Sequence, residues 1–204
     1  MSQTVAKPTT DTSADARTGP SPWRRLARRI WRGLINVFAV IGVLLTLYVT
    51  CFSVEVLETS SMAPTLRGRD ESDPDWVLVE RITYRLRKPR RWEIVAHRSP
   101  HGTPVMKRVI AFPGETVRFV PGAVEVDGVA LVPPDNFPEF TPRSAGPMVL
   151  GRKVKVGFGY FVLGDYSVDS LDSRYLGPIE EESVTGRTVA IIWPPSRWRW
   201  LPPD

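Results

Sequence analysis

The chain has 204 residues, 42% of them apolar, which is enough for one folded domain with a core and short additions. Its net charge of +5 arises at the N-terminus, since residues 1–53 hold seven Lys or Arg and two Asp or Glu whereas residues 54–204 hold twenty of each; a nucleic-acid-binding domain needs a basic face, so we expect no nucleic-acid partner. One cysteine, Cys51, and two histidines, His97 and His101, are too few for a disulfide framework or most metal sites, and we expect neither metal nor cofactor.

Residues 1–22 are rich in Ser, Thr, Ala, Asp and Pro and predict a disordered cytoplasmic tail, because they offer little apolar surface to offset the entropy of ordering. Residues 33–53 then run without a charge for long enough to cross a bilayer as a helix. A cleaved signal peptide and a buried core helix are the alternatives, but the run is longer than a usual signal-peptide apolar region and no small-x-small site precedes Ser61. Residues 23–53 are therefore expected to form a basic flank and a retained transmembrane anchor.

The flank of this anchor predicts its orientation. Five arginines precede the apolar run, and basic flanks stay in the cytoplasm. Residues 54–204 are then extracytoplasmic, and the protein is a single-pass protein of the cell membrane with lipid as a partner. The Trp- and Arg-rich end, residues 193–203, is either a packed terminus or a contact with lipid headgroups. We expect a monomer.

The chain beyond the anchor has a mainly β pattern. Short β-rich runs punctuated by Pro and Gly occupy residues 76–80, 93–98, 105–112, 116–120, 123–126, 159–163 and 188–193. Asp127-Gly128 separates two apolar triplets and predicts a two-residue hairpin. An antiparallel sheet, a sandwich or a partly closed barrel fits this pattern, with surface loops at residues 67–74 and 133–147.

A polar stretch soon after the anchor, residues 58–66, contains the serine of interest. A catalytic serine needs a base within hydrogen-bond reach, because its hydroxyl is a weak nucleophile. His97 and His101 are expected at the surface. Lys107 lies on a predicted strand, on the same apolar face as Val105 and Val109, and loss of hydration there would lower its pKa. The alternative is an edge lysine that reaches solvent.

Four blocks carry a resemblance to a known family. They are Ser-Met-Ala-Pro-Thr-Leu at 61–66, Arg-Trp-Glu-Ile-Val-Ala-His-Arg at 91–98, Lys-Arg-Val-Ile-Ala-Phe-Pro-Gly-Glu at 107–115, and Gly-Asp-Tyr-Ser-Val-Asp-Ser-Leu-Asp-Ser-Arg-Tyr at 164–175. In this order, behind an N-terminal anchor and over roughly residues 31–195, they resemble the type I signal peptidases, the membrane-bound leader peptidases. The second block is similar to that family's RGDIVVF strand and the fourth to its GDNRDNSxDSR box.

The resemblance implies a membrane-anchored serine endopeptidase that cleaves signal peptides from exported preproteins. Ser61 would be the nucleophile and Lys107 the general base, with Thr59 donating its hydroxyl to the oxyanion. Ser170 would orient the lysine amine. The remaining implied residues are a supporting ion pair, Asp172 and Arg174, and candidate pocket walls, Met62, Leu66, Val105 and Met106.

Several positions depart from the family pattern. Tyr166-Ser167-Val168 stands where Asn-Arg-Asp is usual, and Glu58 precedes the oxyanion donor where an apolar residue is common. Trp92 replaces a glycine, and residues 67–74 resemble an insertion; neither is expected to touch the dyad. The competing interpretations are a self-cleaving repressor-type Ser-Lys peptidase, which would be soluble and carry a DNA-binding segment, and a catalytically impaired membrane-tethered β-domain that binds exported proteins.

Overall fold

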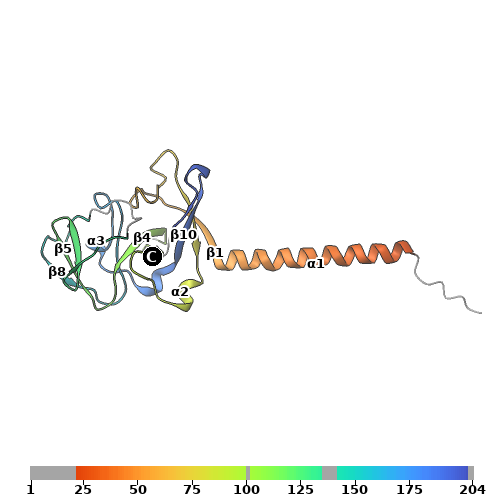
Figure 1. Cartoon of the computed structure of the whole chain (residues 1–204), viewed down its shortest axis with the longest axis horizontal. Helices are drawn as coiled ribbons and strands as arrows, with labels where there is room; N and C mark the ends of the chain where they lie inside the picture. Colours follow the sequence, from red (N-terminus) through yellow and green to blue (C-terminus); the bar gives the residue numbers. More distant parts are fainter. Residues whose placement is uncertain (1–21, 100–101, 135–141, 202–204) are drawn as a thin grey trace, which may run out of the picture. The chain divides into compact units, whose positions relative to one another are not determined.

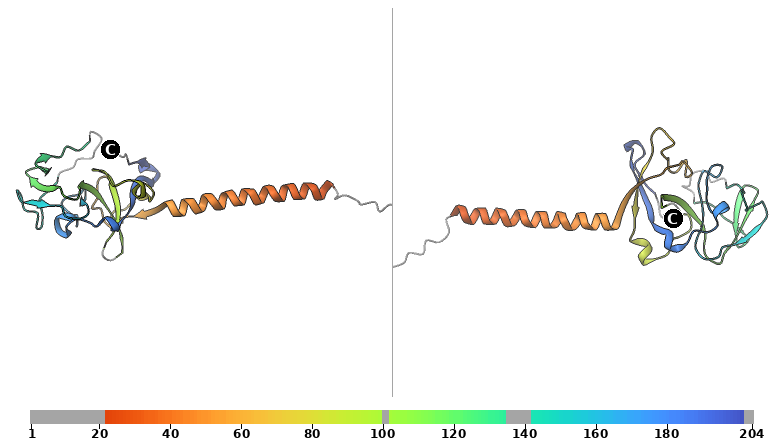
Figure 2. Two further views of the ribbon diagram at one scale, coloured as in Figure 1. Left: turned by 90° about the horizontal axis from the view of Figure 1, so that it is seen from below. Right: turned by 180° about the vertical axis from the view of Figure 1, so that it is seen from behind.

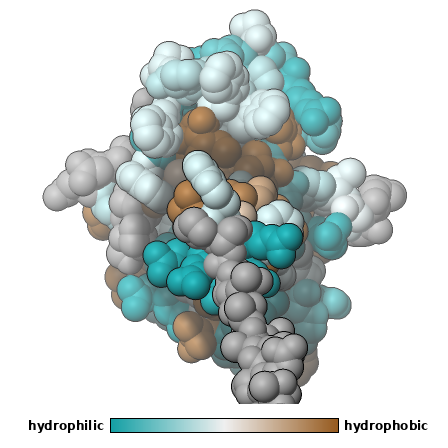
Figure 3. All heavy atoms as spheres, turned by 90° about the vertical axis from the view of Figure 1, so that its right-hand side faces the viewer, coloured by the Kyte–Doolittle hydropathy of each residue, from teal (hydrophilic) through white to brown (hydrophobic). Residues whose placement is uncertain are grey.

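The computed structural model describes residues 22–99, 102–134 and 142–201. Helix α1 spans Pro22–Cys51 and is long and apolar enough to cross a membrane (Figure 1). The helix begins Pro-Trp-Arg-Arg, so its first turns carry the arginines, and Figure 3 views the molecule from the side on which Figure 1 shows this helix. The hydroxyls of Thr46 and Thr50 donate to Gly42 O and Leu47 O, so these polar groups are satisfied within the helix, as a bilayer requires.

The structure modifies the predicted end of the anchor, and parts of three other predictions lie outside the described residues. The last two residues of the predicted anchor, Phe52 and Ser53, are not helical but open strand β1, Phe52–Val56. The predicted tail, apart from Pro22, lies outside the described residues, as does His101. The same holds for residues 135–141 of the second predicted loop.

A seven-stranded antiparallel sheet holds most of the chain after α1. Its order is β1-β2-β10-β3-β4-β9, and β11 also pairs with β10. The strands besides β1 are β2 (Trp76–Glu80), β3 (Ile94–Arg98), β4 (Pro104–Ala111), β9 (Phe161–Leu163), β10 (Val184–Trp193) and β11 (Arg199–Trp200). The first part of β10 pairs with β3 and its later part with β2, so β10 joins two halves of the sheet.

A four-stranded antiparallel sheet, of order β7-β6-β5-β8, forms the second layer. Its strands are β5 (Thr116–Val120), β6 (Ala123–Val126), β7 (Val129–Ala130) and β8 (Lys153–Lys155). Asp127 and Gly128 both have positive φ, 50° and 83°, which confirms the predicted two-residue turn between β6 and β7. Both views of Figure 2 show these green and cyan strands set apart from the blue β10.

Buried apolar side chains join these elements in separate clusters. One cluster bridges the two sheets, with Ile110 and Phe161 from the large sheet against Val117 and Phe119 from the small one. A second packs strands β2, β3 and β10 against the loop after β1, where Met62 and Leu66 are fully buried. Short helices complete the domain: α2 (Thr83–Leu86), α3 (Ser173–Leu176) and two 3-10 turns, Glu181–Ser183 and Pro195–Arg197.

The mainly β, antiparallel prediction is confirmed, and strands β2, β5 and β6 have the predicted bounds. The barrel is not closed, because within the described residues no pairing joins the end strands β1 and β9. The predicted domain of residues 54–204 thus corresponds to two packed sheets rather than one cylinder.

Candidate active site

Ser61 lies in a turn between β1 and β2. Two backbone bonds shape this turn, Ala63 N to Ser60 O at 2.8 Å and Leu66 N to Met62 O at 2.9 Å. The Met62 and Leu66 side chains are buried in the core and hold the turn from beneath. Ser61 is therefore fixed at the domain surface with only 6% of its area exposed.

Lys107 lies on β4 with its amine against this serine. Its Nζ is 2.5 Å from Ser61 Oγ and donates to Met106 O at 3.2 Å. The side chain is 3% exposed, which excludes the solvent-reaching alternative. Burial lowers the pKa of Lys107 from 10.5 to about 8, against the opposing charges of Asp172 and Asp165. An appreciable fraction of the Lys107 side chains is therefore neutral close to pH 7, and a neutral amine can accept a proton.

The acidic box packs behind the lysine. Asp172 and Arg174 form a fully buried bidentate pair, with Arg174 Nε to Oδ1 and Nη2 to Oδ2 both at 2.8 Å. Asp172 also accepts from Gly164 N and from Ser170 Oγ, at 3.0 and 2.7 Å. The buried charges of Asp172 and Arg174 are thus both hydrogen-bonded, which offsets the cost of removing them from water.

Ser170 belongs to the same box. Its hydroxyl donates to Asp172, an ionised and thus strong acceptor. Gly164 lets Ser170 lie close to the backbone of Ser61, because it has no side chain. A Cβ at Gly164 would lie 2.2 Å from Ser170 Oγ and 2.4 Å from Ser61 O. Orientation of Lys107 by Ser170 stays a prediction.

A second buried ion pair, to which the sequence assigned no role, ties the lysine strand to the nucleophile loop. Arg108 donates to Asp165 through Nε at 2.7 Å and through Nη2 at 2.6 Å, and Thr65 Oγ1 donates to the same carboxylate at 2.5 Å. Arg108 also donates to Trp92 O. Trp92 has a φ of 72°, which explains why the family has glycine at this position.

Two cavities meet at the dyad. The larger, about 370 Å³, is lined by Ser61 and Lys107 together with Asp70, Asp169 and Leu171. The smaller, about 170 Å³, is lined by Glu58, Met106 and Pro104, among others. Thr59, Ser61 and Val105 border both.

Two predictions about this cleft are wrong. Met62 and Leu66 are 0% exposed and pack in the core, so among the described residues they form no pocket wall, unlike Val105 and Met106. His97 was expected at the surface but is buried, with 8% of its area exposed, and lines the larger cavity; burial lowers its pKa to about 4. The predicted loop at residues 67–74 contributes Asp70 to the lining of the same cavity.

A serine hydroxyl 2.5 Å from a buried amine of lowered pKa, at the meeting point of two cavities, is the arrangement of a serine hydrolase. Helix α1 is long and apolar enough to anchor such an enzyme in a membrane. The chain belongs to the signal peptidase family, peptidase S26, whose family model matches residues 30–193. It is accordingly a membrane-anchored signal peptidase.

Relatives of known type agree with this assignment. A probable signal peptidase I-2 of Synechocystis is 34% identical over 175 residues, covering 81% of this chain and 75% of that protein. Signal peptidase I V of Bacillus subtilis is 31% identical, over 79% of this chain and 96% of that protein. A mitochondrial inner membrane protease subunit 2 of Danio rerio is 29% identical, over 87% of this chain and 84% of that protein.

Proposed function

We propose that Ser61 is the nucleophile and Lys107 the general base in the removal of signal peptides from exported preproteins. The observation that carries this assignment is the 2.5 Å separation of Lys107 Nζ and Ser61 Oγ in a water-poor environment. Neutral Lys107 accepts the Ser61 proton as Oγ attacks the scissile carbonyl. The protonated amine then gives that proton to the leaving amine, and water hydrolyses the acyl-enzyme by the reverse route.

The oxyanion formed in this attack needs two donors. The backbone N–H of Ser61 is one, and the hydroxyl of Thr59, which borders both cavities, is the other. Asp172 and Arg174 support the box behind Lys107 without taking part in proton transfer. Ser170 fixes that box through its bond to Asp172.

The proposed substrate is an extended peptide with small side chains near the cut. The smaller cavity, about 170 Å³ and bordered by Val105 and Met106, is the proposed binding place for one of these side chains. An extended segment can add to the edge of a sheet through main-chain hydrogen bonds. Glu58 borders this cavity and pairs with Arg69 at 3.7 Å, so the charge that it brings to the site is partly offset.

The proposed location is the cell membrane, with the N-terminus in the cytoplasm and the catalytic domain outside. The arginine-rich start of α1 supports this orientation, because basic flanks stay in the cytoplasm. Trp198 and Trp200 are 70% and 72% exposed, which supports contact of the C-terminal segment with lipid headgroups. The protein acts as a monomer without a metal.

The test is cleavage of a preprotein with an Ala-x-Ala site by the full-length protein in detergent. Ser61→Ala and Lys107→Met are expected to abolish cleavage, because each removes one half of the dyad. The matched controls are Ser72→Ala, at an exposed serine of a nearby loop, and Lys153→Met, at an exposed lysine of β8. Cleavage that survives in either dyad variant refutes the assignment. Absence of cleavage by the parent protein, with binding retained, would favour the non-catalytic binding domain.

A further inference from the structure

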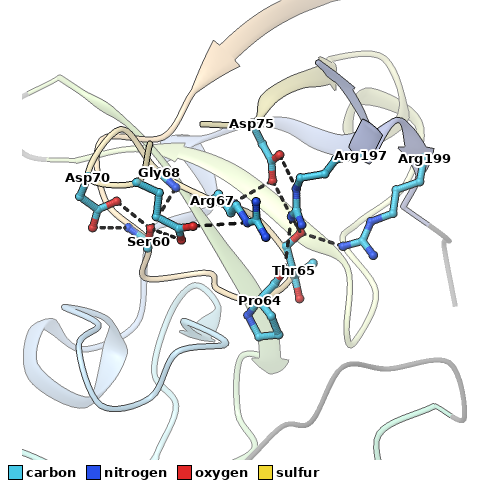
Figure 4. A network of polar contacts seen from close by, with 10 residues as sticks. Ser60, Pro64, Thr65, Arg67, Gly68, Asp70, Asp75, Arg197 and Arg199 are labelled. Atoms are coloured by element: carbon cyan, nitrogen blue, oxygen red, sulfur yellow. Dashed lines mark hydrogen bonds and ion pairs between the residues drawn. The ribbon is translucent and has the colours of Figure 1, made fainter. Parts of the chain in front are cut away.

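The loop after the nucleophile turn folds back onto the residue that precedes the nucleophile (Figure 4). Ser60 N donates to Asp70 Oδ2 at 3.0 Å, and Ser60 Oγ lies 2.6 Å from Asp70 Oδ1. Gly68 N donates to Ser60 Oγ at 3.1 Å, and Glu71 Oε1 is 2.8 Å from the same hydroxyl. Backbone and side chain of one residue are thus held by one carboxylate.

This arrangement fixes the direction of the Ser61 N–H. The Ser60 carbonyl accepts from Ala63 N at 2.8 Å. In a trans peptide the C=O and the following N–H point in opposite directions, so a held Ser60 carbonyl directs the Ser61 N–H to the other side. Asp70 holds the preceding peptide through the Ser60 N–H, and with it the backbone of Thr59.

The loop also lies against the backbone too closely for a side chain. A Cβ at Gly68 would lie 2.2 Å from the carbonyl carbon of Thr59 and 2.7 Å from Ser60 N. Such approach is possible only for glycine, because a real Cβ cannot come that near to backbone atoms. Gly68 therefore sets the distance between the loop and the Thr59–Ser61 backbone.

The far end of the loop is anchored independently. Asp75 is fully buried, accepts from Arg67 N at 2.9 Å and pairs with Arg197 through Nε at 2.7 Å and Nη2 at 2.9 Å. Arg199 Nη2 donates to Thr65 O at 2.8 Å, as Figure 4 shows. Because its last residue is fixed in the core, the loop can transmit a constraint to Ser60 rather than move with it.

We propose that the segment Arg67–Asp75 is a brace for the oxyanion site, in which Ser60 and Asp70 are positioning residues that hold the Thr59 hydroxyl and the Ser61 N–H toward the reacting carbonyl. This inference rests on the proposed roles of Ser61 and Thr59. Neither Ser60 nor Asp70 touches the reacting atoms in this scheme. Their effect is on transition-state stabilisation and not on the pKa of Lys107 or on peptide binding.

The experiment compares Asp70→Ala and Asp70→Asn in the full-length protein with Asp73→Ala, a change at an exposed carboxylate of the same loop. We expect kcat to fall about tenfold in Asp70→Ala, because a small displacement of oxyanion donors costs less than the 10²–10³-fold of removing one. Asp70→Asn keeps one acceptor oxygen and is expected to lie between Asp70→Ala and the parent. KM and the pH midpoint are expected to match the parent.

Inhibition by a peptide aldehyde ending in alanine supplies a second readout. The aldehyde forms a hemiacetal oxyanion on Ser61, so its affinity is expected to fall in Asp70→Ala by the same factor as kcat, while affinity for an uncleavable peptide stays unchanged. Ser60→Ala combined with Asp70→Ala is expected to lose less than the two single losses multiplied together, since both changes remove the contact between Ser60 Oγ and Asp70 Oδ1.

The outcomes separate the two proposals. A kcat of Asp70→Ala equal to that of Asp73→Ala overturns the brace, as does a loss of kcat that comes with a shifted pH midpoint or with equally weakened peptide binding. Neither result affects the dyad, which fails only if Ser61→Ala still cleaves. The brace is supported when Ser61→Ala is inactive and Asp70→Ala loses kcat and aldehyde affinity together.

Discussion

The lowered pKa of Lys107 predicts a specific pH dependence of the peptidase. Only the neutral amine can accept the Ser61 proton, so kcat/KM should follow the neutral fraction. With a pKa of about 8, about one molecule in eleven carries a neutral Lys107 at pH 7, against about one in three thousand at the ordinary value of 10.5. Burial of the side chain thus provides about a 300-fold increase in active enzyme at that pH.

The assay is kcat/KM for a fluorogenic peptide with an Ala-x-Ala site, from pH 6 to 10 in detergent at constant ionic strength. The expected profile rises about tenfold per pH unit below 8 and is flat above about 9, until other groups titrate. His97→Gln is the control, because the pKa of His97 is lowered to about 4 and its proton is already absent over this range. A profile already flat from pH 6, or one that still rises tenfold per unit at pH 10, would refute the reasoning.

Three stability predictions accompany it, each read from chemical denaturation. Asp172→Asn is expected to cost about 3–5 kcal/mol, because it leaves Arg174 buried without its counter-charge. Trp92→Gly relieves the strain of a left-handed backbone, about 1–2 kcal/mol, but removes a buried indole that contributes about 3–5 kcal/mol. A net loss of stability is therefore expected, and a gain in stability would show that the strain dominates. Arg197→Met is expected to cost about 2 kcal/mol, since Asp75 loses two charged hydrogen bonds; an unchanged midpoint would contradict this.

The position of Lys107 could be predicted only in part from local signals. Lys107 occupies an apolar strand face, but alternation along one strand left an edge lysine that reaches solvent as the alternative. The Asp127-Gly128 turn and strands β5 and β6 were predictable, since turn chemistry and β-branched residues act over a few positions. The pairing of Lys107 with Ser61 was predicted from the resemblance of the sequence blocks to the signal peptidase family, and not from the strand pattern.

The errors concern contacts between distant segments. His97 has a strand position that the sequence gives no reason to bury, and only the packing of β3 beside β4 places it against Lys107. Met62 and Leu66 were assigned to pockets because they flank the nucleophile, but the core beneath the turn takes both side chains. Whether an apolar residue lines a cavity or fills a core depends on tertiary packing, which spacing does not encode.

The loop after Leu66 shows a further limit. Its polar composition predicted only exposure, and half of residues 67–74 are exposed. What gives it a role is the return of Asp70 to Ser60 and the pairing of Asp75 with Arg197, which is more than a hundred positions later in the chain. Neither contact leaves a periodic signal in the sequence.

The position of β10 has a consequence for the order of synthesis. Ser61 lies between β1 and β2, whereas Lys107 lies on β4, which pairs with β3, and among the described strands β10 is the one that joins these two pairs. Before Val184 has been synthesised, Ser61 and Lys107 therefore lie on separate hairpins with no strand pairing to join them. Peptidase activity is then expected to begin only after β10 has paired with both β2 and β3.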